Sequence, residues 1–246
     1  MSVDSLLQEN AHLWQLKIPV KLSTHFKQQE FSCLSMLEKQ KYNAFRFERD
    51  RNTYLFSHAY LRKILARYVE LNSKNIEYVY NKYGRPELLR SINKDNLRFN
   101  LSHTNGMVVY IICYDRDCGI DVEYISPLDD LAYMAERVFS NSEAKIVKEL
   151  IGRQQLDQFY LYWTLKESYI KARGMGLQIP LDQFSFILDA KPRIKFSDHI
   201  LDYPNDWCFN CFRPTNEYII STSIKQNEFK FSTILQKDSS LLELPP

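Results

Sequence analysis

The sequence predicts an α+β fold of two similar halves that meet near residues 115–118. Two long segments, about 50–71 and 157–173, repeat apolar residues at helical spacing. Short alternating runs separated by turn residues occur in both halves and are typical of small antiparallel sheets. The coarse order of helices and strands is alike in the two halves, although there is no exact repeat. We therefore expect two subdomains, 1–116 and 117–246, each a small, mostly antiparallel sheet with helices.

In the first half, each element follows from a local pattern. Short apolar groups mixed with polar residues predict a strand and loop near the start, and Gly84 and Pro86 fix a turn. A polar stretch, 102–106, predicts a loop, and 115–117 predicts a tight turn. The expected elements are a strand and loop over 1–30, helices over 31–43 and 50–71, and strands over 76–80, 97–101 and 107–114.

In the second half, a strand over 118–125 is expected to pair with 107–114 as a hairpin. Ser142 is expected to cap a helix, because its hydroxyl can accept a hydrogen bond from a free backbone N–H. The last strands are expected to be antiparallel and to pack back on the first half. The expected elements are helices over 131–138, 142–152 and 157–173 and strands over 184–188, 194–196, 207–212, 217–223 and 229–235.

Composition limits the class of protein. The chain has 246 residues, 45% hydrophobic and 25% charged, which is ordinary for a globular protein, and its net charge of +2 is too small for a general nucleic-acid binder. The five cysteines have no framework spacing, which favours a reducing compartment. Cys208 and Cys211 lack two further zinc ligands at comparable spacing. No apolar run of about 18 residues and no leader pattern is present, so we expect a cytoplasmic protein without membrane contact.

The helix over 157–173 carries charge in an unusual place. At 100° per residue it has two apolar arcs, so it is packed from two sides and lies in the interior. Glu167 and Lys171 lie on the polar arc between them. Buried charges are rare unless they are paired or coordinated. The two residues can form an ordinary i,i+4 ion pair or belong to a functional site, and the helix alone leaves both interpretations open.

Two carboxylates share one face of the strand over 118–125. The period of two places Asp121 and Glu123 together and Ile120 and Val122 on the opposite face. Carboxylates about 6–7 Å apart on one face repel each other unless a cation lies near them. A cation site and a solvated hairpin face are both compatible with this pattern.

Four motifs follow one another along the chain: Gly84-Arg85-Pro86, Asn100-Leu101-Ser102-His103, Gly119-Ile120-Asp121-Val122-Glu123 and Trp163-Thr164-Leu165-Lys166-Glu167-Ser168. Together they resemble the motifs of the Sfp-type family of 4′-phosphopantetheinyl transferases, in that family's order and spacing. Gly174-x-Gly176-Leu177 follows as the family leads one to expect, and Arg85 replaces the family's lysine while keeping its charge. The resemblance covers about residues 38–190. It implies a monomer whose two subdomains are related by a pseudo-two-fold axis.

The resemblance also implies a reaction. Coenzyme A would donate its 4′-phosphopantetheine group to a serine of an apo carrier protein (acyl, peptidyl or aryl) and leave as 3′,5′-ADP. Cleavage of a pyrophosphate requires cations that neutralise its oxygens. Asp121, Glu123 and Glu167 would supply three hard oxygen ligands for Mg²⁺. Lys171 would face the same phosphates, and the serine proton would pass to Glu167, Glu143 or a metal-bound water, a choice that the sequence leaves open.

The same resemblance assigns residues to coenzyme A. Ser102 and His103 would meet the 3′-phosphate together with Lys41, which belongs to a basic cluster that otherwise suggests a solvated face. The Gly84-Arg85-Pro86 turn, with Lys82 before it, would cradle adenine and ribose. The full expected set is Lys41, Arg46, Lys82, Gly84, Arg85, Pro86, Ser102, His103, Lys166 and Lys171.

Two other functions remain open from the sequence. A module that only binds coenzyme A would not need three carboxylates, whereas a metal-dependent pyrophosphohydrolase would use water in place of a serine. The carrier itself is not identified, and we expect its contact surface within 126–156. Basic residues there could steer an acidic carrier helix, although a solvated helix face would look the same: Arg137, Lys145, Lys148 and Arg153.

Overall fold

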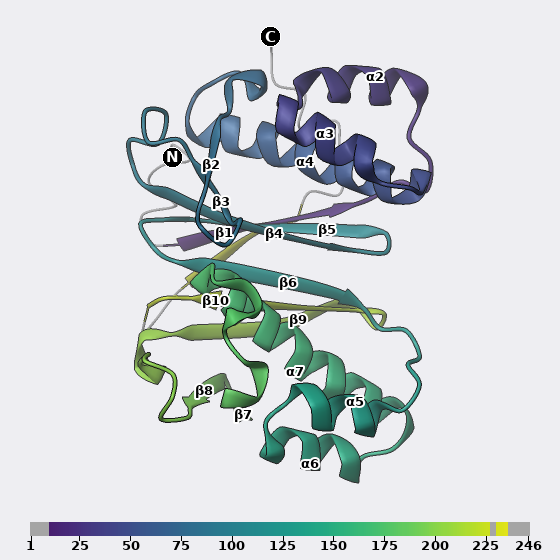
Figure 1. Ribbon diagram of the computed structural model, residues 1–246, viewed down its shortest axis with the longest axis vertical. Helices are drawn as coiled ribbons and strands as arrows, with labels where there is room; N and C mark the ends of the chain where they lie inside the picture. The colour runs from purple at the N-terminus through teal and green to yellow at the C-terminus, as the bar shows by residue number, and fades with distance from the viewer. Residues whose placement is uncertain (1–9, 227–229, 236–246) are drawn as a thin grey trace.

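Two sheets pack against each other at the centre of the computed structural model, which describes residues 10–226 and 230–235 (Figure 1). The first sheet has the strand order β11-β1-β5-β4 and the second has the order β6-β10-β9. Helices α2, α3 and α4 cover the outer side of the first sheet, and α5, α6 and α7 lie on the outer side of the second. The predicted α+β fold of two subdomains is confirmed.

The described elements have the following bounds. In the first half they are β1 (Asn10–Lys17), α2 (Thr24–Cys33), α3 (Met36–Ala44), α4 (Glu48–Tyr68), η1 (Ser73–Asn75), β2 (Tyr78–Tyr80), β3 (Pro86–Leu88), β4 (Leu97–Thr104) and β5 (Met107–Tyr114). In the second half they are β6 (Cys118–Tyr124), α5 (Leu131–Val138), α6 (Asn141–Glu149), α7 (Gly152–Arg173), η2 (Gly176–Gln178), η3 (Leu181–Gln183), β7 (Phe184–Leu188), β8 (Pro192–Phe196), η4 (Pro204–Asp206), β9 (Cys208–Thr215), β10 (Tyr218–Ile224) and β11 (Lys230–Leu235).

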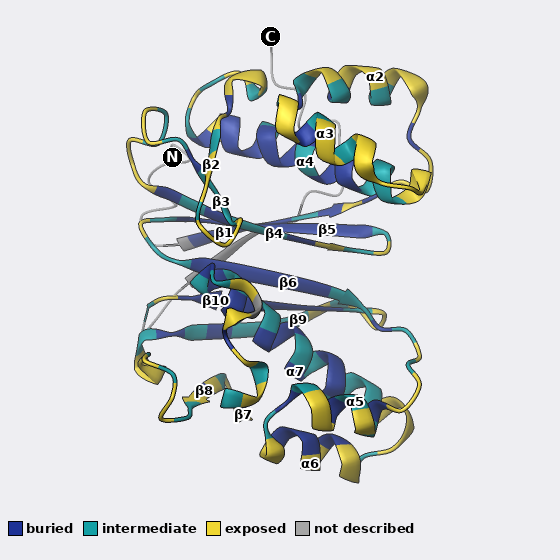
Figure 2. Cartoon of the chain, viewed as in Figure 1, coloured by how far each residue is buried: buried dark blue, intermediate teal, exposed yellow. Residues whose placement is uncertain are grey.

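Strand β5 shows why the sheets stack. Its side chains alternate between two apolar environments: Val108 and Tyr110 pack in the core under α4, whereas Val109 and Ile111 pack between the sheets. A strand buried on both faces is a near-continuous apolar run, which residues 107–113 are. Figure 2 shows this central layer as buried and the outer helices as exposed on their far sides.

The second sheet begins at β6, which is not the hairpin partner of β5. Strand β6 pairs with β10 along its length, and no described ladder joins it to β5. The predicted hairpin is therefore wrong: the turn after Tyr114 carries the chain from one sheet into the other. Alternation along β6 then buries Ile120 and Val122 between the sheets and turns Asp121 and Glu123 toward α7.

Other expected boundaries differ in smaller ways. Ser102 and His103 lie in strand β4, which continues to Thr104, and not in a loop. A helix, α2, occupies part of the expected first loop, and α7 begins at Gly152. Strand β11 runs parallel to β1, so the chain returns to the first sheet in an orientation opposite to the one expected.

The N-cap of α6 is Ser140, where Ser142 was expected. The Ser140 hydroxyl accepts from the Glu143 N–H, and the Glu143 carboxylate accepts from the Ser140 N–H. Of the two serines, Ser140 has a glutamate three residues later, which completes this reciprocal capping box, whereas Ser142 has Lys145 at that spacing.

Helix α7 lies unusually close to β6 because of Gly119. A Cβ at this position would be 2.0 Å from the carbonyl oxygen of Ser168 and 2.5 Å from the backbone N of Ala172. Only glycine permits this contact between helix and strand backbones. Close contact brings the side chains of Glu167 and Lys171 against the carboxylates of β6. Within residues 10–226 and 230–235, no helix is both long and apolar enough to cross a membrane.

Candidate active site

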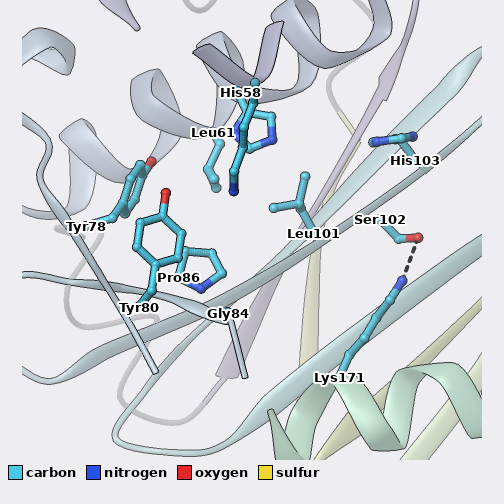
Figure 3. Close-up of a pocket in the computed structure, with 11 residues that line it drawn as sticks. His58, Leu61, Tyr78, Tyr80, Gly84, Pro86, Leu101, Ser102, His103 and Lys171 are labelled. Carbon is cyan, nitrogen blue, oxygen red and sulfur yellow. Dashed lines mark hydrogen bonds between the residues drawn. The ribbon is translucent and has the colours of Figure 1, made fainter. Parts of the chain in front are cut away.

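A pocket of about 310 Å³ opens where the first subdomain meets the end of α7 (Figure 3). In Figure 3, Tyr80 and Pro86 lie on one side and Leu61 and Leu101 on another, which leaves an apolar slot suited to a planar ring. The lining residues come from both halves of the chain: Lys41, His58, Leu61, Tyr78, Tyr80, Gly84, Pro86, Leu101, Ser102, His103 and Lys171.

The pocket is basic. Its lining includes Lys41, His58, His103 and Lys171, from α3, α4, β4 and α7 respectively, and it includes no Asp or Glu among the described residues. The Lys41 ammonium lies 5.1 Å from the centre of the Tyr80 ring, which holds it at the slot. Partial desolvation, and then the proximity of His58 and Lys171, lowers the pKa of His103. Two lysines and two imidazoles that converge from four elements offer N–H donors, and they make this pocket suited to an anion such as phosphate.

A buried ion pair supports the back of the pocket. Glu38 Oε2 lies 2.8 Å from Arg62 Nε, and each side chain is about 1% exposed. Glu38 Oε1 lies 3.3 Å from His58 Nδ1, so the other ring nitrogen of His58 points away from Glu38. Burial raises the pKa of Glu38, but its contacts with His58, Arg62 and Ser35 lower it overall to about 2. The charged carboxylate thus ties α3, which carries Lys41, to α4, which carries His58.

Lys171 links the pocket to the carboxylates of β6. Its Nζ lies 2.6 Å from Asp121 Oδ1 and 3.0 Å from Ser102 Oγ, and the Ser102 hydroxyl donates to the same Oδ1 over 2.8 Å. The other oxygen of Asp121, Oδ2, is buried and has no hydrogen-bond partner within the described part of the chain. Ser102 therefore directs its hydroxyl toward Asp121 and Lys171, as Figure 3 shows for the lysine.

Asp121 perturbs two neighbouring carboxyl groups. Burial, followed by the charge of Asp121, raises the pKa of Glu123 to about 7, although Lys171 and a hydrogen bond with Trp163 oppose the shift. Burial and then Asp121 also raise the pKa of Glu167. Carboxyl groups that disfavour one another's charge are suited to share a cation.

The chemistry of these three carboxylates fits a hard divalent cation. All three offer oxygen donors, and the buried Oδ2 of Asp121 has no other partner. In residues 10–226 and 230–235, no three Asp, Glu, His or Cys side chains are already gathered closely enough to hold an ion. Lys171 lies on Asp121 in this arrangement.

The Asn-x-Ser motif joins the two sheets. Alternate residues of β4 contact β6: Asn100 Oδ1 accepts from the Ile120 N–H at 3.2 Å, and Thr104 Oγ1 accepts from the Tyr124 N–H at 3.2 Å. Ser102 lies between them and donates to Asp121. These side chains replace the backbone hydrogen bonds that β4 and β6 do not make, and they fix Asp121 relative to the pocket.

Arg85 is turned away from the pocket, although Gly84 and Pro86 line it. Its guanidinium donates to the Ala172 carbonyl at 2.7 Å and lies 2.8 Å from Glu87. The turn is thereby attached to the last turn of α7. Two further residues expected to contact coenzyme A, Arg46 and Lys82, are exposed and stack on the neighbouring rings of Phe47 and Tyr83.

The structure does not bring Glu143 and Lys166 to the pocket. They form an ion pair of 2.8 Å in the interior, at 1% and 0% exposure. Lys166 also donates to the carbonyls of Leu181 and Phe184, and Glu143 accepts from the Phe186 N–H. Every oxygen of Glu143 is engaged, so the carboxylate fastens α6 and β7 to α7 and has no free oxygen for a serine proton.

Several pocket residues were not anticipated: His58, Leu61, Tyr78, Tyr80 and Leu101. One pattern pointed to His58. It lies three residues after Leu55 and four before Arg62, so it shares the apolar face expected for that helix. A histidine and an arginine on one apolar face indicate a buried polar contact, because such groups are rarely buried alone.

Comparisons with known proteins show the family to which the chain belongs. The family described as "4'-phosphopantetheinyl transferase superfamily" matches residues 117–223, and "4'-phosphopantetheinyl transferase, N-terminal" matches residues 22–113. The chain is 33% identical to 4'-phosphopantetheinyl transferase HetI of Nostoc sp. (strain PCC 7120 / SAG 25.82 / UTEX 2576), over 70% of this chain and 72% of that protein. It is 30% identical to 4'-phosphopantetheinyl transferase Sfp of Bacillus subtilis (strain 168), over 72% of this chain and 77% of that protein. The two family matches meet at the passage from β5 to β6.

Proposed function

Because the chain belongs to the 4′-phosphopantetheinyl transferase superfamily and is an enzyme of the Sfp type, we propose that it transfers 4′-phosphopantetheine from coenzyme A to a serine of an apo carrier protein, using the pocket and the carboxylates beside it. The observation that carries the assignment of residues is the position of Lys171. It lines the basic pocket and contacts Asp121, so it joins an anion-binding region to a group of carboxylates.

The adenosine end of coenzyme A is assigned to the pocket. The slot bounded by Tyr80, Pro86 and Leu101 suits adenine, and Lys41, His58 and His103 offer donors to the 3′-phosphate. Ser102 acts at the edge of the pocket next to the carboxylates, where its hydroxyl orients Asp121 and Lys171. The pyrophosphate then lies near Lys171, at the boundary between pocket and carboxylates.

Asp121, Glu123 and Glu167 would hold Mg²⁺ in this proposal. The ion would neutralise the pyrophosphate oxygens and the charge that develops on the leaving phosphate. The chain's own residues orient the reactants. Lys171 donates to a phosphate oxygen, and the wall formed by β4 fixes the distance between the nucleotide and Asp121.

Glu167 is proposed to take the serine proton. It lies one turn from Lys171 on α7, beside the proposed site of transfer, whereas the other candidate carboxylate, Glu143, is engaged in the interior. The serine oxygen forms a bond to the phosphorus that carries pantetheine, and the bond from that phosphorus to the bridging oxygen breaks. The leaving 3′,5′-ADP keeps the electron pair of that bond, and the proton remains on Glu167.

Mass spectrometry tests the function. Enzyme, Mg²⁺, coenzyme A and an apo carrier protein should yield the carrier with one phosphopantetheine added and an equal amount of 3′,5′-ADP. Asp121→Ala and Glu123→Ala should lose most transfer at low Mg²⁺ and keep their fold. Release of 3′,5′-ADP without a carrier adduct would identify a pyrophosphohydrolase, and no product from a correctly folded enzyme would identify a binding module.

A further inference from the structure

Lys171 places its positive charge directly on Asp121, one of the three carboxylates proposed to hold the metal ion. Its ammonium contacts Asp121 Oδ1 at 2.6 Å and is fixed there by Ser102, whose oxygen is 3.0 Å from the same nitrogen. The Asp121 side chain is 5% exposed, and that of Lys171 is 28% exposed. A buried carboxylate needs a counter-charge, and Lys171 provides it.

A divalent cation on Asp121 would compete with this ammonium. Two cations on one carboxylate repel strongly in a partly buried site, where water screens charge poorly. The lysine has a long, flexible stem, and its partly exposed end also lines the basic pocket. An anion in that pocket would offer the ammonium a second partner.

We propose that Lys171 is the resident counter-cation of Asp121, and that a divalent ion binds tightly only when this ammonium moves from Asp121 to a phosphate in the pocket. The inference rests on the metal site of the proposed function and adds an order to it. Metal and nucleotide then assist each other's binding, and by linkage the assistance is equal in both directions. The enzyme without nucleotide would hold its metal weakly.

The linkage has a direct consequence for variants. Removing the positive charge at position 171 should strengthen metal binding in the absence of coenzyme A, although the same change removes a residue needed for transfer. A residue that only positions substrate would leave metal affinity unchanged when replaced. Keeping the charge, as in Lys171→Arg, should keep metal affinity low.

Mn²⁺ binding to the full chain, measured by calorimetry and by electron paramagnetic resonance without coenzyme A or carrier, tests the proposal. Lys171→Met should bind Mn²⁺ at least about tenfold more tightly than wild type, as expected for loss of a competing charge. Lys171→Arg should match wild type. The exposed lysine of α6 supplies the control: Lys145→Met should also match wild type.

A second measurement follows the wild-type protein itself and uses a variant only to assign one resonance. In wild-type protein with ¹⁵N-labelled lysine side chains, Mg²⁺ should shift or broaden the Nζ resonance that is missing from the spectrum of Lys171→Arg. Three results would each overturn the inference. The first is that Lys171→Met binds Mn²⁺ no more tightly than wild type does, and the second is that neither protein binds Mn²⁺ at all. The third is a Lys171 resonance that saturating Mg²⁺ does not move. Transfer to the carrier is measured separately by mass spectrometry. If Lys171→Met binds Mn²⁺ tightly but the wild-type enzyme transfers nothing to the carrier, this inference is supported and the proposed function is contradicted.

Discussion

Lys166 Nζ lies 2.8 Å from Glu143 Oε2, and the two side chains are 0% and 1% exposed. The pair connects α7 to the N-terminus of α6, where Glu143 also completes the capping box. Lys166 is adjacent to Glu167, yet one residue stabilises the interior and the other faces Asp121. Along a helix, neighbouring residues are 100° apart, so one motif can serve both purposes.

Breaking this pair should destabilise the protein severely. Lys166→Met leaves the Glu143 carboxylate buried without its counter-charge, and we expect the free energy of unfolding to fall by about 3–5 kcal/mol. The double variant Glu143→Gln/Lys166→Met should recover most of the loss, because no buried charge remains. Urea denaturation measures both. A loss as small as that of the exposed control Lys145→Met, about 1 kcal/mol or less, would show that the pair is not buried in solution.

Gly119→Ala should be among the most disruptive small substitutions in the chain. The added methyl group would lie 2.0 Å from the Ser168 carbonyl oxygen, and neither backbone can move without separating α7 from β6. We expect a loss of about 3 kcal/mol or more in the free energy of unfolding, at the upper end for overpacked sites. Gln154→Ala, at an exposed position of α7, is the control, because its side chain can be removed without a clash. Similar melting temperatures for the two variants would contradict the close contact.

Sequence patterns predicted the parts of this fold that depend on local spacing. The period of two correctly placed Asp121 and Glu123 on one face of β6, and helical spacing correctly predicted α4 and most of α7. Local spacing could not predict which strand pairs with β6. The turn after Tyr114 is as short as a hairpin turn, but β6 pairs with β10, about a hundred residues later.

The residues of the pocket also divide into those that the sequence predicted and those that it did not. Lys41 is about 60 residues from Ser102 and His103 in the sequence, and only the motif resemblance suggested that the three meet. The structure brings all three to one pocket. His58 and Glu38 belong to none of the four motifs. Burial decided the roles of Glu143 and Lys166, and burial of a charged residue depends on a partner elsewhere in the chain.

Glu123 should make the metal-free protein less stable as pH rises. Burial and Asp121 raise its pKa to about 7, whereas the unfolded chain releases the same proton near its ordinary value of 4.5. The folded state therefore binds more protons in this window, and stability falls as pH rises from about 4.5 to about 7. Glu123→Gln should be more stable than wild type by about 1–3 kcal/mol at about pH 8 and equal to it at about pH 4. Urea titrations with a chelator present measure this, and a difference that does not change with pH would contradict it.

Lys145 and Lys148 test the carrier surface. Both are exposed on α6, and they pair with Glu149 and Glu136 at 3.9 Å and 2.7 Å. Reversing both to Glu should raise KM for an acidic carrier and leave KM for coenzyme A unchanged, because charges at the rim of an interface mainly affect encounter. The effect should weaken with added salt. The exposed Lys74→Glu serves as the control, and equal changes in both KM values would assign the two lysines to the nucleotide.

The last prediction concerns the 3′-phosphate. Lys41, His58 and His103 line one pocket from three different elements, and the phosphate assigned to them is remote from the bond that breaks. Its contacts should therefore supply binding and positioning and take no part in bond breaking. Dephospho-coenzyme A lacks this phosphate, so wild-type kcat/KM should be lower for it than for coenzyme A. The penalty should be about 1.5–3 kcal/mol for each charge-assisted hydrogen bond lost.

His103→Ala, Lys41→Ala and His58→Ala should each reduce kcat/KM for coenzyme A and leave that for dephospho-coenzyme A nearly unchanged. His25→Ala, at an exposed histidine of α2, should change neither value. A variant that loses equally on both substrates identifies a residue that does not bind this phosphate, and for His58 that result would restrict its role to the contact with Glu38.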